Sequence, residues 1–336
     1  DIVQSKRADT TFVLMAMPRG NWSDDFLPDI KSTLQLGTGA TYFDQGAFVG
    51  RYDTMLIHVF LTGTRALSST DIGTLKEQLN NITKPWRVRL EESLKERYLD
   101  QETGQIFQDY SNAFEATYTE RRPMEEVLDD IEMLESVRGS IDPTVALLTR
   151  ADTGRAYLRV YQPENIALSK MLPVIDTFGL HSQNQFADPV RLANGSMLWM
   201  DTFRFEPSEQ FSLEELAEMA PLITDAIEAI FANKVTSDSL NLLLLWAKIP
   251  WKAIDLFRAL FGYARQLGLP YDLSKLQAIL MSKPQLVNQL WSFFETKFNP
   301  NLTGDRETQL NAAAEEAEMS IRSLSNQEQD VVFRTF

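Results

Sequence analysis

The chain changes its apolar pattern at about residue 210. Before Phe211, short apolar runs that end at turn residues alternate with stretches of helical spacing. After Phe211, apolar residues recur at intervals of three and four through segments separated by proline or glycine. Alternating runs predict strands paired with helices, whereas the later pattern predicts helices alone. We therefore expect an α+β protein whose C-terminal part is all helical.

Residues 1–84 hold three runs of strand length and two helical patterns. The strands are expected at 11–17, 40–49 and 55–61. Helices are expected after Ser23 or Asp24 and after Ser68, because serine and aspartate commonly cap helix N-termini. The resulting order, strand–helix–strand–strand–helix, is that of a ferredoxin-like α+β sandwich.

Residues 85–138 predict a helical connector. Its helical positions carry an apolar and aromatic stripe formed by Trp86, Leu90, Leu94, Phe107, Tyr110, Phe114 and Tyr118. The spacing of this stripe favours a buried core over a ligand-binding aromatic box. Residues 91–135 hold 14 acids and four bases, and so carry most of the net charge of −15. Such acidity is typical of a solvated helical face; docking against a basic partner is the alternative.

Residues 139–210 return to an α+β pattern, with a hairpin signal at Asp152-Thr153-Gly154. Pro173 lies inside the helical pattern of this segment and is expected to bend the helix or restrict its start. The expected elements are strands at 144–150 and 156–162, a helix at 168–178 that Gly179 ends, and a strand at 197–205. We expect a second module similar in element content to the first.

Residues 211–336 predict a packed helical bundle. Ser212 and Glu215 form a capping-box pattern for its first helix, which is expected to break at Pro221. A surface helix is expected from Asp305 onward. Further helices are expected at 237–246, 251–267, 273–281 and 284–298.

Composition excludes several classes of function. A net charge of −15 opposes binding to nucleic acid and to anionic membrane surfaces, so neither partner is expected. No apolar run reaches the length needed to span a bilayer. The absence of cysteine removes disulfides, thiolate catalysis and cysteine-based metal sites. The two histidines, His58 and His181, are far apart in sequence, and each is expected to be an ordinary strand residue.

Motifs for nucleotide binding and catalysis are also missing. The sequence contains no Gly-Gly and no Gly-Lys pair, which excludes the P-loop and the Rossmann fingerprint. Gly37-Thr38-Gly39 follows a helix and is expected to be a helix end. Adjacent carboxylates at Glu125-Glu126 and Asp129-Asp130 diverge on a helix and are expected to be solvated.

Scattered bases in the bundle could bind an anion but are expected to face solvent: Lys248, Lys252, Arg258 and Arg265. No catalytic, cofactor-binding or metal-binding residue is assigned.

One stretch carries a family resemblance. Residues 168–179, LSKMLPVIDTFG, resemble the LSxxLPxLExxG stretch of the large bacterial NAD-specific glutamate dehydrogenases. The resemblance preserves order over about residues 10–336 and includes residues 86–118 and Asp129-Asp130-Ile131-Glu132. One departure is 180–185, LHSQNQ, where the family commonly has a strand. Further similar runs are LWMDTF at 198–203, residues 239–245, RALFGYARQLGL at 258–269 and LWSFFETKFNP at 290–300.

The resemblance implies a domain plan. It implies ACT-like modules at 1–84 and 139–210, the acidic connector at 85–138, and a bundle at 211–336 that leads toward a catalytic domain. The chain, which begins at Asp1 without methionine, is then expected to be cut from a longer cytoplasmic polypeptide.

The parent reaction would be the oxidative deamination of L-glutamate to 2-oxoglutarate with NAD. The segment itself is expected to be regulatory or structural, with no cofactor of its own. Its expected partners are the rest of the polypeptide, further copies in a homo-oligomer, and a small-molecule effector. The alternative is a freestanding effector-binding or scaffold protein built from ACT-like modules.

Overall fold

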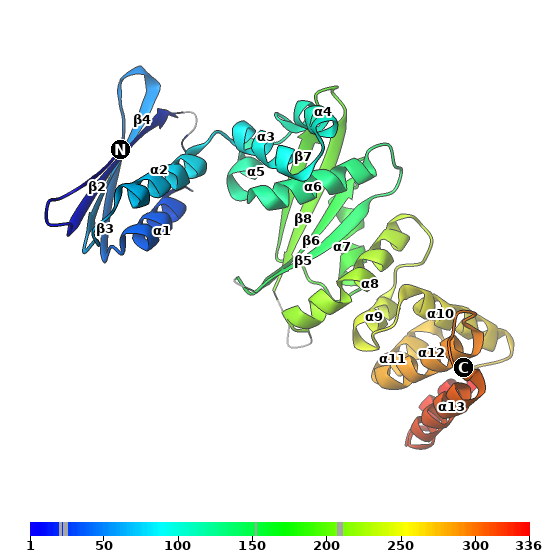
Figure 1. Cartoon of the computed structure of the whole chain (residues 1–336). Helices are drawn as coiled ribbons and strands as arrows, with labels where there is room; N and C mark the ends of the chain where they lie inside the picture. Colours follow the sequence, from blue (N-terminus) through cyan, green and yellow to red (C-terminus); the bar gives the residue numbers. More distant parts are fainter. Residues whose placement is uncertain (20–21, 23–25, 152, 207–210) are drawn as a thin grey trace. The chain divides into compact units, whose positions relative to one another are not determined.

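Two modules of the chain have the same order of elements and the same order of strands (Figure 1). The computed structural model describes residues 1–19, 22, 26–151, 153–206 and 211–336. These residues form two compact units, Asp1–Glu132 with Val190–Ser196, and Met133–Pro189 with Met197–Phe336.

The first module is a four-stranded antiparallel sheet with helices on one face. Its strand order is β1-β2-β4-β3. The elements are β1 (Ile2–Gln4), β2 (Thr10–Pro18), α1 (Phe26–Thr38), β3 (Tyr42–Val49), η2 (Arg51–Asp53), β4 (Thr54–Thr62) and α2 (Ser69–Thr83). Ser68 caps α2 in a capping box with Asp71. The three strands and two helices expected for this module are confirmed, while the caps suggested at Ser23 and Asp24 lie outside the described residues.

Residues 85–138 are helical, as expected, but the aromatic stripe does not run along one helix. The helices are α3 (Trp86–Arg97), α4 (Asp100–Tyr110), α5 (Ala116–Arg121) and α6 (Met124–Val137). The chain turns after Tyr110, so Phe114 lies in a turn and Tyr118 in the next helix. A spacing of three and four therefore persists across a turn, which sequence periodicity cannot distinguish from a continuous helix.

The second module repeats the plan of the first with the strand order β5-β6-β8-β7. Its elements are β5 (Thr144–Arg150), β6 (Arg155–Gln162), α7 (Leu168–Asp176), β7 (Asn184–Arg191), β8 (Met197–Phe205) and α8 (Leu213–Phe231). Helix α8 packs along β5, and the Glu228 carboxylate accepts a hydrogen bond of 2.8 Å from the Val145 backbone N–H.

Two strands were not predicted from the sequence, one because it is short and one because it is polar. Strand β1 has three residues, and β7 is polar and contains Pro189. Both lie at sheet edges, where proline is tolerated because one row of backbone groups has no partner strand. The departure noted at 180–185 therefore does not remove the strand, which begins at Asn184.

The C-terminal part is helical as expected. It contains η3 (Ser239–Asn241), α9 (Leu242–Trp246), α10 (Trp251–Gln266), α11 (Leu273–Ser282), α12 (Pro284–Phe298), α13 (Arg306–Arg322) and α14 (Gln327–Thr335). The segment expected as one helix at 237–246 is a 3₁₀ turn followed by a short α-helix. No helix among the described residues is long and apolar enough to cross a membrane.

The break expected at Pro221 is wrong, because α8 continues through it. Proline removes the hydrogen bond to the carbonyl of Ala217. Both residues are exposed, so water can solvate that carbonyl. Pro173 likewise lies inside α7, and Ser169, whose carbonyl loses its hydrogen bond there, is also exposed.

The second module and the C-terminal helices share one hydrophobic core. It runs from Val145 and Leu158 in the sheet, through Ile223 and Ile227 in α8, to Phe333 in α14. The first module has its own smaller core between its sheet and its two helices.

Gly179 gives a test of this shared packing. It has a φ of +73°, and a Cβ atom there would lie 2.9 Å from Leu242 Cδ2. We expect Gly179→Ala to lower the free energy of unfolding by about 2 kcal/mol, since it adds a clash to the backbone strain. Gly154→Ala is the control because its φ of +66° carries the strain alone, with no heavy atom within 4 Å. Equal losses in urea denaturation would show that the contact with Leu242 contributes nothing.

Candidate functional site

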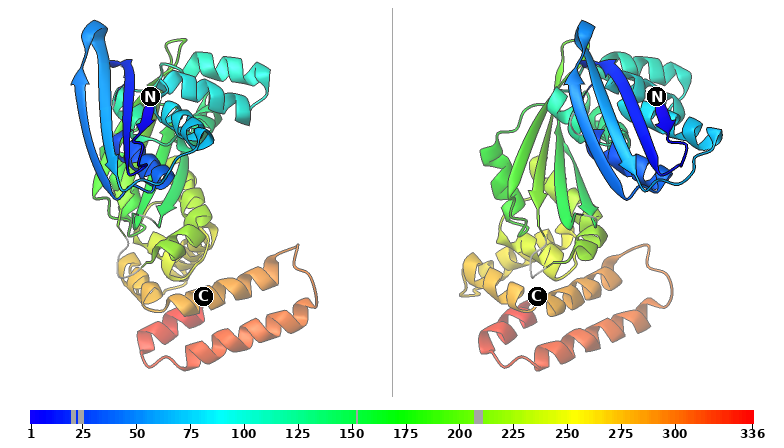
Figure 2. Two further views of the ribbon diagram at one scale, coloured as in Figure 1. Left: turned by 60° about the vertical axis from the view of Figure 1, so that its left-hand side comes forward. Right: turned by 90° about the vertical axis from the view of Figure 1, so that its left-hand side faces the viewer.

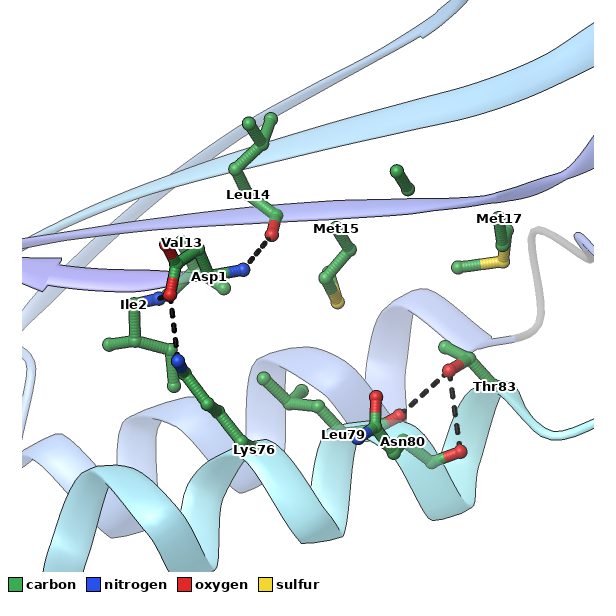
Figure 3. A pocket seen from close by; sticks show the side chains of 11 residues that line it. Asp1, Ile2, Val13, Leu14, Met15, Met17, Lys76, Leu79, Asn80 and Thr83 are labelled. Atoms are coloured by element: carbon green, nitrogen blue, oxygen red, sulfur yellow. Dashed lines mark hydrogen bonds and ion pairs between the residues drawn. The ribbon is translucent and has the colours of Figure 1, made fainter. Parts of the chain in front are cut away.

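A hollow of about 250 Å³ lies in the first module between β2 and α2 (Figure 3). Its floor is apolar and includes Met15, Met17 and Leu79. Its two charged lining residues are Asp1 and Lys76, whose Oδ1 and Nζ atoms form an ion pair of 2.7 Å. The hollow therefore offers a polar rim in which the charges already neutralise each other.

Two further hollows lie in the second unit. One of about 270 Å³ has an apolar floor that includes Phe211, Met219 and Trp246, with Glu215 and Lys248 also lining it. The other, of about 450 Å³, is lined mainly by polar residues from the end of α11, from α12 and from the end of α13, among them Gln289 and Ser320. The second lining also contains Ser282, whose hydroxyl donates to the Ile279 carbonyl at 2.7 Å and accepts from Gln329 Nε2 at 3.0 Å.

The second module contains a buried carboxylate on the sheet face that packs against α7. Asp201 of β8 is 5% exposed. Its Oδ2 accepts a hydrogen bond of 2.6 Å from Gln162 Nε2, and its Oδ1 accepts another from Gln185 Nε2. The Gln162 side chain is held in turn by the Ile166 backbone N–H, which donates to Oε1 at 2.7 Å. This cluster joins β6, β7 and β8 through side chains.

Burial raises the pKa of the Asp201 carboxyl above its ordinary value, and the two glutamine amides oppose this by hydrogen bonding to the charged form. The net direction is upward. Asp201 is thus a carboxylate whose charge is costly to bury and only partly compensated.

A second polar network joins α7 to the C-terminal helices. Arg258 of α10 makes a two-pronged contact with Asp238, with Nε–Oδ2 at 3.0 Å and Nη2–Oδ1 at 2.9 Å. Arg258 Nη2 also donates to Asn241 Oδ1 at 2.9 Å. Asn241 Nδ2 donates to Thr177 Oγ1 at 3.0 Å, at the C-terminal end of α7.

Ser237 completes this network with a contact of 3.2 Å between its hydroxyl and that of Thr177. We call these five residues the α7–η3 joint: Thr177, Ser237, Asp238, Asn241 and Arg258. The Arg258 and Asp238 side chains are only 13% and 19% exposed, so their charge-assisted hydrogen bonds are little screened by water.

The bases considered as an anion site do not act together. Arg258 is engaged within the α7–η3 joint rather than facing solvent, so that expectation is wrong for it. Lys248, Lys252 and Arg265 are exposed, as expected. Lys252 and Arg265 each lie over an aromatic ring of their own helix, Trp251 and Phe261.

The stripe of the connector is buried at Leu90, Leu94, Tyr110 and Tyr118, as expected, and partly buried at its other three residues, Trp86, Phe107 and Phe114. The rings of Phe114 and Tyr118 stack with centroids 4.3 Å apart, and Tyr110 is fully buried. Asp130 is also fully buried and accepts a hydrogen bond of 2.7 Å from the Tyr118 hydroxyl, so the expectation that it is solvated is wrong. Its position on the inner face of α6 explains the difference.

Asp129 and Glu126 of α6 are paired with bases, and Glu125 is exposed, as expected. Asp129 pairs with Arg97 at 2.7 Å and is exposed, as expected. Glu126 is only 16% exposed and pairs with Arg122 at 3.3 Å, so it too is less solvated than expected.

The histidines and the Gly37–Gly39 turn have ordinary surroundings. His58 lies in β4 between the rings of Phe12 and Phe48, whereas His181 is exposed and lies before β7 rather than in a strand. Gly39 has a φ of +72° and donates from its backbone to the Gln35 carbonyl, as a helix end does. Within the described ranges, no group of three or more acidic or histidine side chains could hold a metal ion.

The Asp201 cluster was not predicted from the sequence. A signal was present: strand 197–205 is apolar on both faces except for one aspartate, one threonine and one arginine. A charged residue on a face expected to be buried suggests a specific partner. The partners Gln162 and Gln185 lie in other strands, and nothing in local spacing connects them to Asp201.

Asp201 gives the second unit a pH dependence of known sign. An acid with a raised folded-state pKa holds its proton more tightly when folded. Stability is therefore lost as pH rises from the unfolded-state value of about 4 through the folded-state pKa. We expect Asp201→Asn to lack this loss, so that its urea midpoint improves relative to the parent chain between pH 4 and pH 8. Glu164→Gln, at an exposed position, should show the same change of urea midpoint with pH as the parent chain. If the urea midpoint of the parent chain instead rises relative to that of Asp201→Asn as pH increases, the pKa of Asp201 is not raised by folding.

Comparisons with known proteins match two parts of the chain. Residues 145–218 match the family model described as glutamate dehydrogenase, ACT3 domain. Residues 235–300 match the one described as glutamate dehydrogenase, helical motif 3. The first range covers the second module from β5 into α8, and the second runs from before η3 to the end of α12.

Curated relatives carry the same name in three organisms. The NAD-specific glutamate dehydrogenase of Mycobacterium tuberculosis is 28% identical over 237 residues, and that of Pseudomonas aeruginosa 24% over 231, each covering 68% of this chain. The Halomonas elongata protein of that name is 22% identical over 292 residues, or 85% of this chain.

The matched region is 14% of the length of the first two relatives and 18% of the third. The chain thus spans less than a fifth of these relatives. Its residues 145–218 and 235–300 are similar to the ACT3 domain and to helical motif 3 of glutamate dehydrogenases, and these matches fit a segment of a large NAD-specific glutamate dehydrogenase.

Proposed function

We propose that the chain is a non-catalytic regulatory and assembly segment of a large NAD-dependent glutamate dehydrogenase, N-terminal to the catalytic domain. The observation that carries the proposal is the adjacent match to an ACT3 domain and a helical motif 3. The relatives' name supports oxidative deamination of L-glutamate with NAD as the reaction of the whole polypeptide.

The proposed domain plan is two ACT-like modules, 1–84 and 139–210, joined by an acidic helical connector at 85–138 and followed by a bundle at 211–336. The shared order of strands and helices in the two modules supports treating the first as ACT-like too. Fold likeness alone does not assign a ligand to either module. We also propose that the polypeptide is cytoplasmic. Its proposed partners are a small-molecule effector and further copies of the same polypeptide.

The Gly37–Gly39 turn does not fit a dinucleotide such as NAD. A dinucleotide is normally held where a glycine-rich turn follows a strand and opens a helix, so that backbone N–H groups face the pyrophosphate. Gly37 and Gly39 instead lie at the C-terminal end of α1, where carbonyl groups are exposed. We therefore assign cofactor binding to the rest of the polypeptide.

The α7–η3 joint supports a regulatory role in a specific way. It connects the end of a helix in the second module to the start of the C-terminal helices through five hydrogen-bonded side chains. A displacement of α7 would therefore strain contacts made by α10. We propose that the joint transmits a change in the ACT-like module to the helical part.

A direct assay tests the non-catalytic part of the proposal. The purified 336-residue chain should not form NADH from NAD⁺ and L-glutamate, followed by absorbance, because the groups for that reaction lie elsewhere. Turnover by the chain alone would overturn it. A reading frame that continues past Phe336 into a glycine-rich, lysine-containing motif supports the proposal, whereas a stop codon there favours the freestanding scaffold.

Arg258→Lys tests the joint. Lysine cannot reproduce the two-pronged contact with Asp238 and the third bond to Asn241, so we expect a loss of about 2 kcal/mol in the free energy of unfolding. Deuterium uptake should also rise in the peptide that contains Thr177, because Asn241, which donates to Thr177 Oγ1, is no longer held by the arginine.

Arg265→Lys is the matched control, since it lies in the same helix and is exposed. Its effect should stay within about 0.5 kcal/mol. If Arg258→Lys destabilises the chain but leaves uptake at α7 unchanged, the joint holds the helices without coupling them to the module.

A further inference from the structure

The first module has a sheet face that its helices leave open. Residues of β2 and β4 with odd numbers point to α1 and α2, and several of them, such as Val13 and Val59, are fully buried. The even-numbered residues point the other way. The right-hand view of Figure 2 looks onto this open face.

The open face is apolar and aromatic. Its exposed large side chains are Val3, Phe12, Leu14, Tyr42, Phe48 and Phe60, each between 39% and 59% exposed. His58 lies among them, with its ring centroid 6.5 Å from that of Phe12 and 6.2 Å from that of Phe48. From their exposed fractions, these side chains present on the order of 500 Å² of surface, which is the size of the largest apolar patch on a typical monomer.

The corresponding face of the second sheet is buried. By strand order, β6 and β8 of the second module correspond to β2 and β4 of the first. Tyr161 and Met200, on the side of the second sheet away from α7 and α8, are each 1% exposed. In the second module, therefore, the folded protein covers the sheet face that is left exposed in the first module.

The charge on the open face restricts what can cover it. Besides His58, its strands carry one acidic or basic residue there, Asp44, on the edge strand β3. A partner that recognises this protein through electrostatic complementarity would need charged groups opposite its own, and this face has almost none. The chain as a whole carries −15, so two copies repel each other least where they meet through their neutral surfaces.

We propose that the open face of the first module is a homodimer interface that binds the same face of a second copy. This inference rests on the proposed assembly role and names its surface. A two-fold axis uses one patch twice, so a neutral aromatic face is its own complement. Two such sheets would pack face to face about 10 Å apart, with the aromatic side chains interdigitating as in a β-sandwich.

Leu14→Asp tests the interface by adding a charge to the centre of the face. Sedimentation velocity on the 336-residue chain should show a monomer–dimer equilibrium, with a dissociation constant in the micromolar range. Leu14→Asp should raise that constant about 100-fold, because each copy would bury an unpaired carboxylate. Leu36→Asp is the matched control: Leu36 is 83% exposed on α1 of the same module, and its replacement should leave the constant unchanged.

A label experiment places the contact without perturbing it by charge. Because the chain has no cysteine, Ala16→Cys adds a single spin-label site on the open face. Pairs of labels at this site should be closer than pairs at Leu36→Cys in the dimer. Circular dichroism equal to that of the parent chain shows that each variant is folded.

Two results would overturn the inference. A parent chain that stays monomeric at about 100 μM has no such interface, since standard interfaces hold at lower concentrations. A dimer that Leu14→Asp leaves intact is held by another surface, such as the sheet edges. Neither result bears on the NADH assay, so failure of the interface is distinguishable from failure of the proposed function.

Discussion

A four-stranded sheet has two faces, and in each module the two helices can cover only one. This constraint organises both modules. In the first, α1 and α2 bury one face and leave the other exposed. In the second, residues on both faces are buried, and the side toward α7 and α8 merges with the core of the C-terminal helices. Much of what distinguishes the modules follows from what lies on the second face of each sheet.

Two networks of polar side chains in the second unit fix the relative positions of elements that apolar packing alone would not fix. Asp201 is held by amides from two other strands, which fixes the relative positions of β6, β7 and β8. The α7–η3 joint fixes how α7 meets the helices that follow. Hydrogen bonds in water-poor surroundings are directional and costly to break, so these two networks set geometry where hydrophobic contact alone would permit sliding.

Periodicity identified the strands and helices that have one strongly apolar face. The strands at β2, β4, β5, β6 and β8, and most C-terminal helices, follow from it within a few residues. It did not reveal β1 or β7, because short or polar edge strands lack alternation. It also placed a break at Pro221, although solvent can replace the lost hydrogen bond there.

The polar sites were less accessible to prediction than the elements. Asp130 was expected to be solvated because adjacent acids are usually on the surface, whereas it lies on the buried side of α6 beside Tyr118. In the sequence, Arg258 is one of several scattered bases, and only the folded structure shows that it contacts Asp238 and Asn241. Contacts of this kind depend on tertiary geometry, which spacing along one element does not contain.

The residues that fold around helix α8 extend beyond each of the two stretches that match a family model. The ACT3 match ends at residue 218, yet Ile223, Ile227 and Ile230 beyond it belong to the core beneath the second sheet. The same core contains Leu243 and Phe257, which lie within the helical motif 3 match. A fragment cut at either boundary would expose this interior to water. Residues 133–189 and 197–336 are therefore expected to unfold as one cooperative block, while the first module, with a core of its own, can unfold separately.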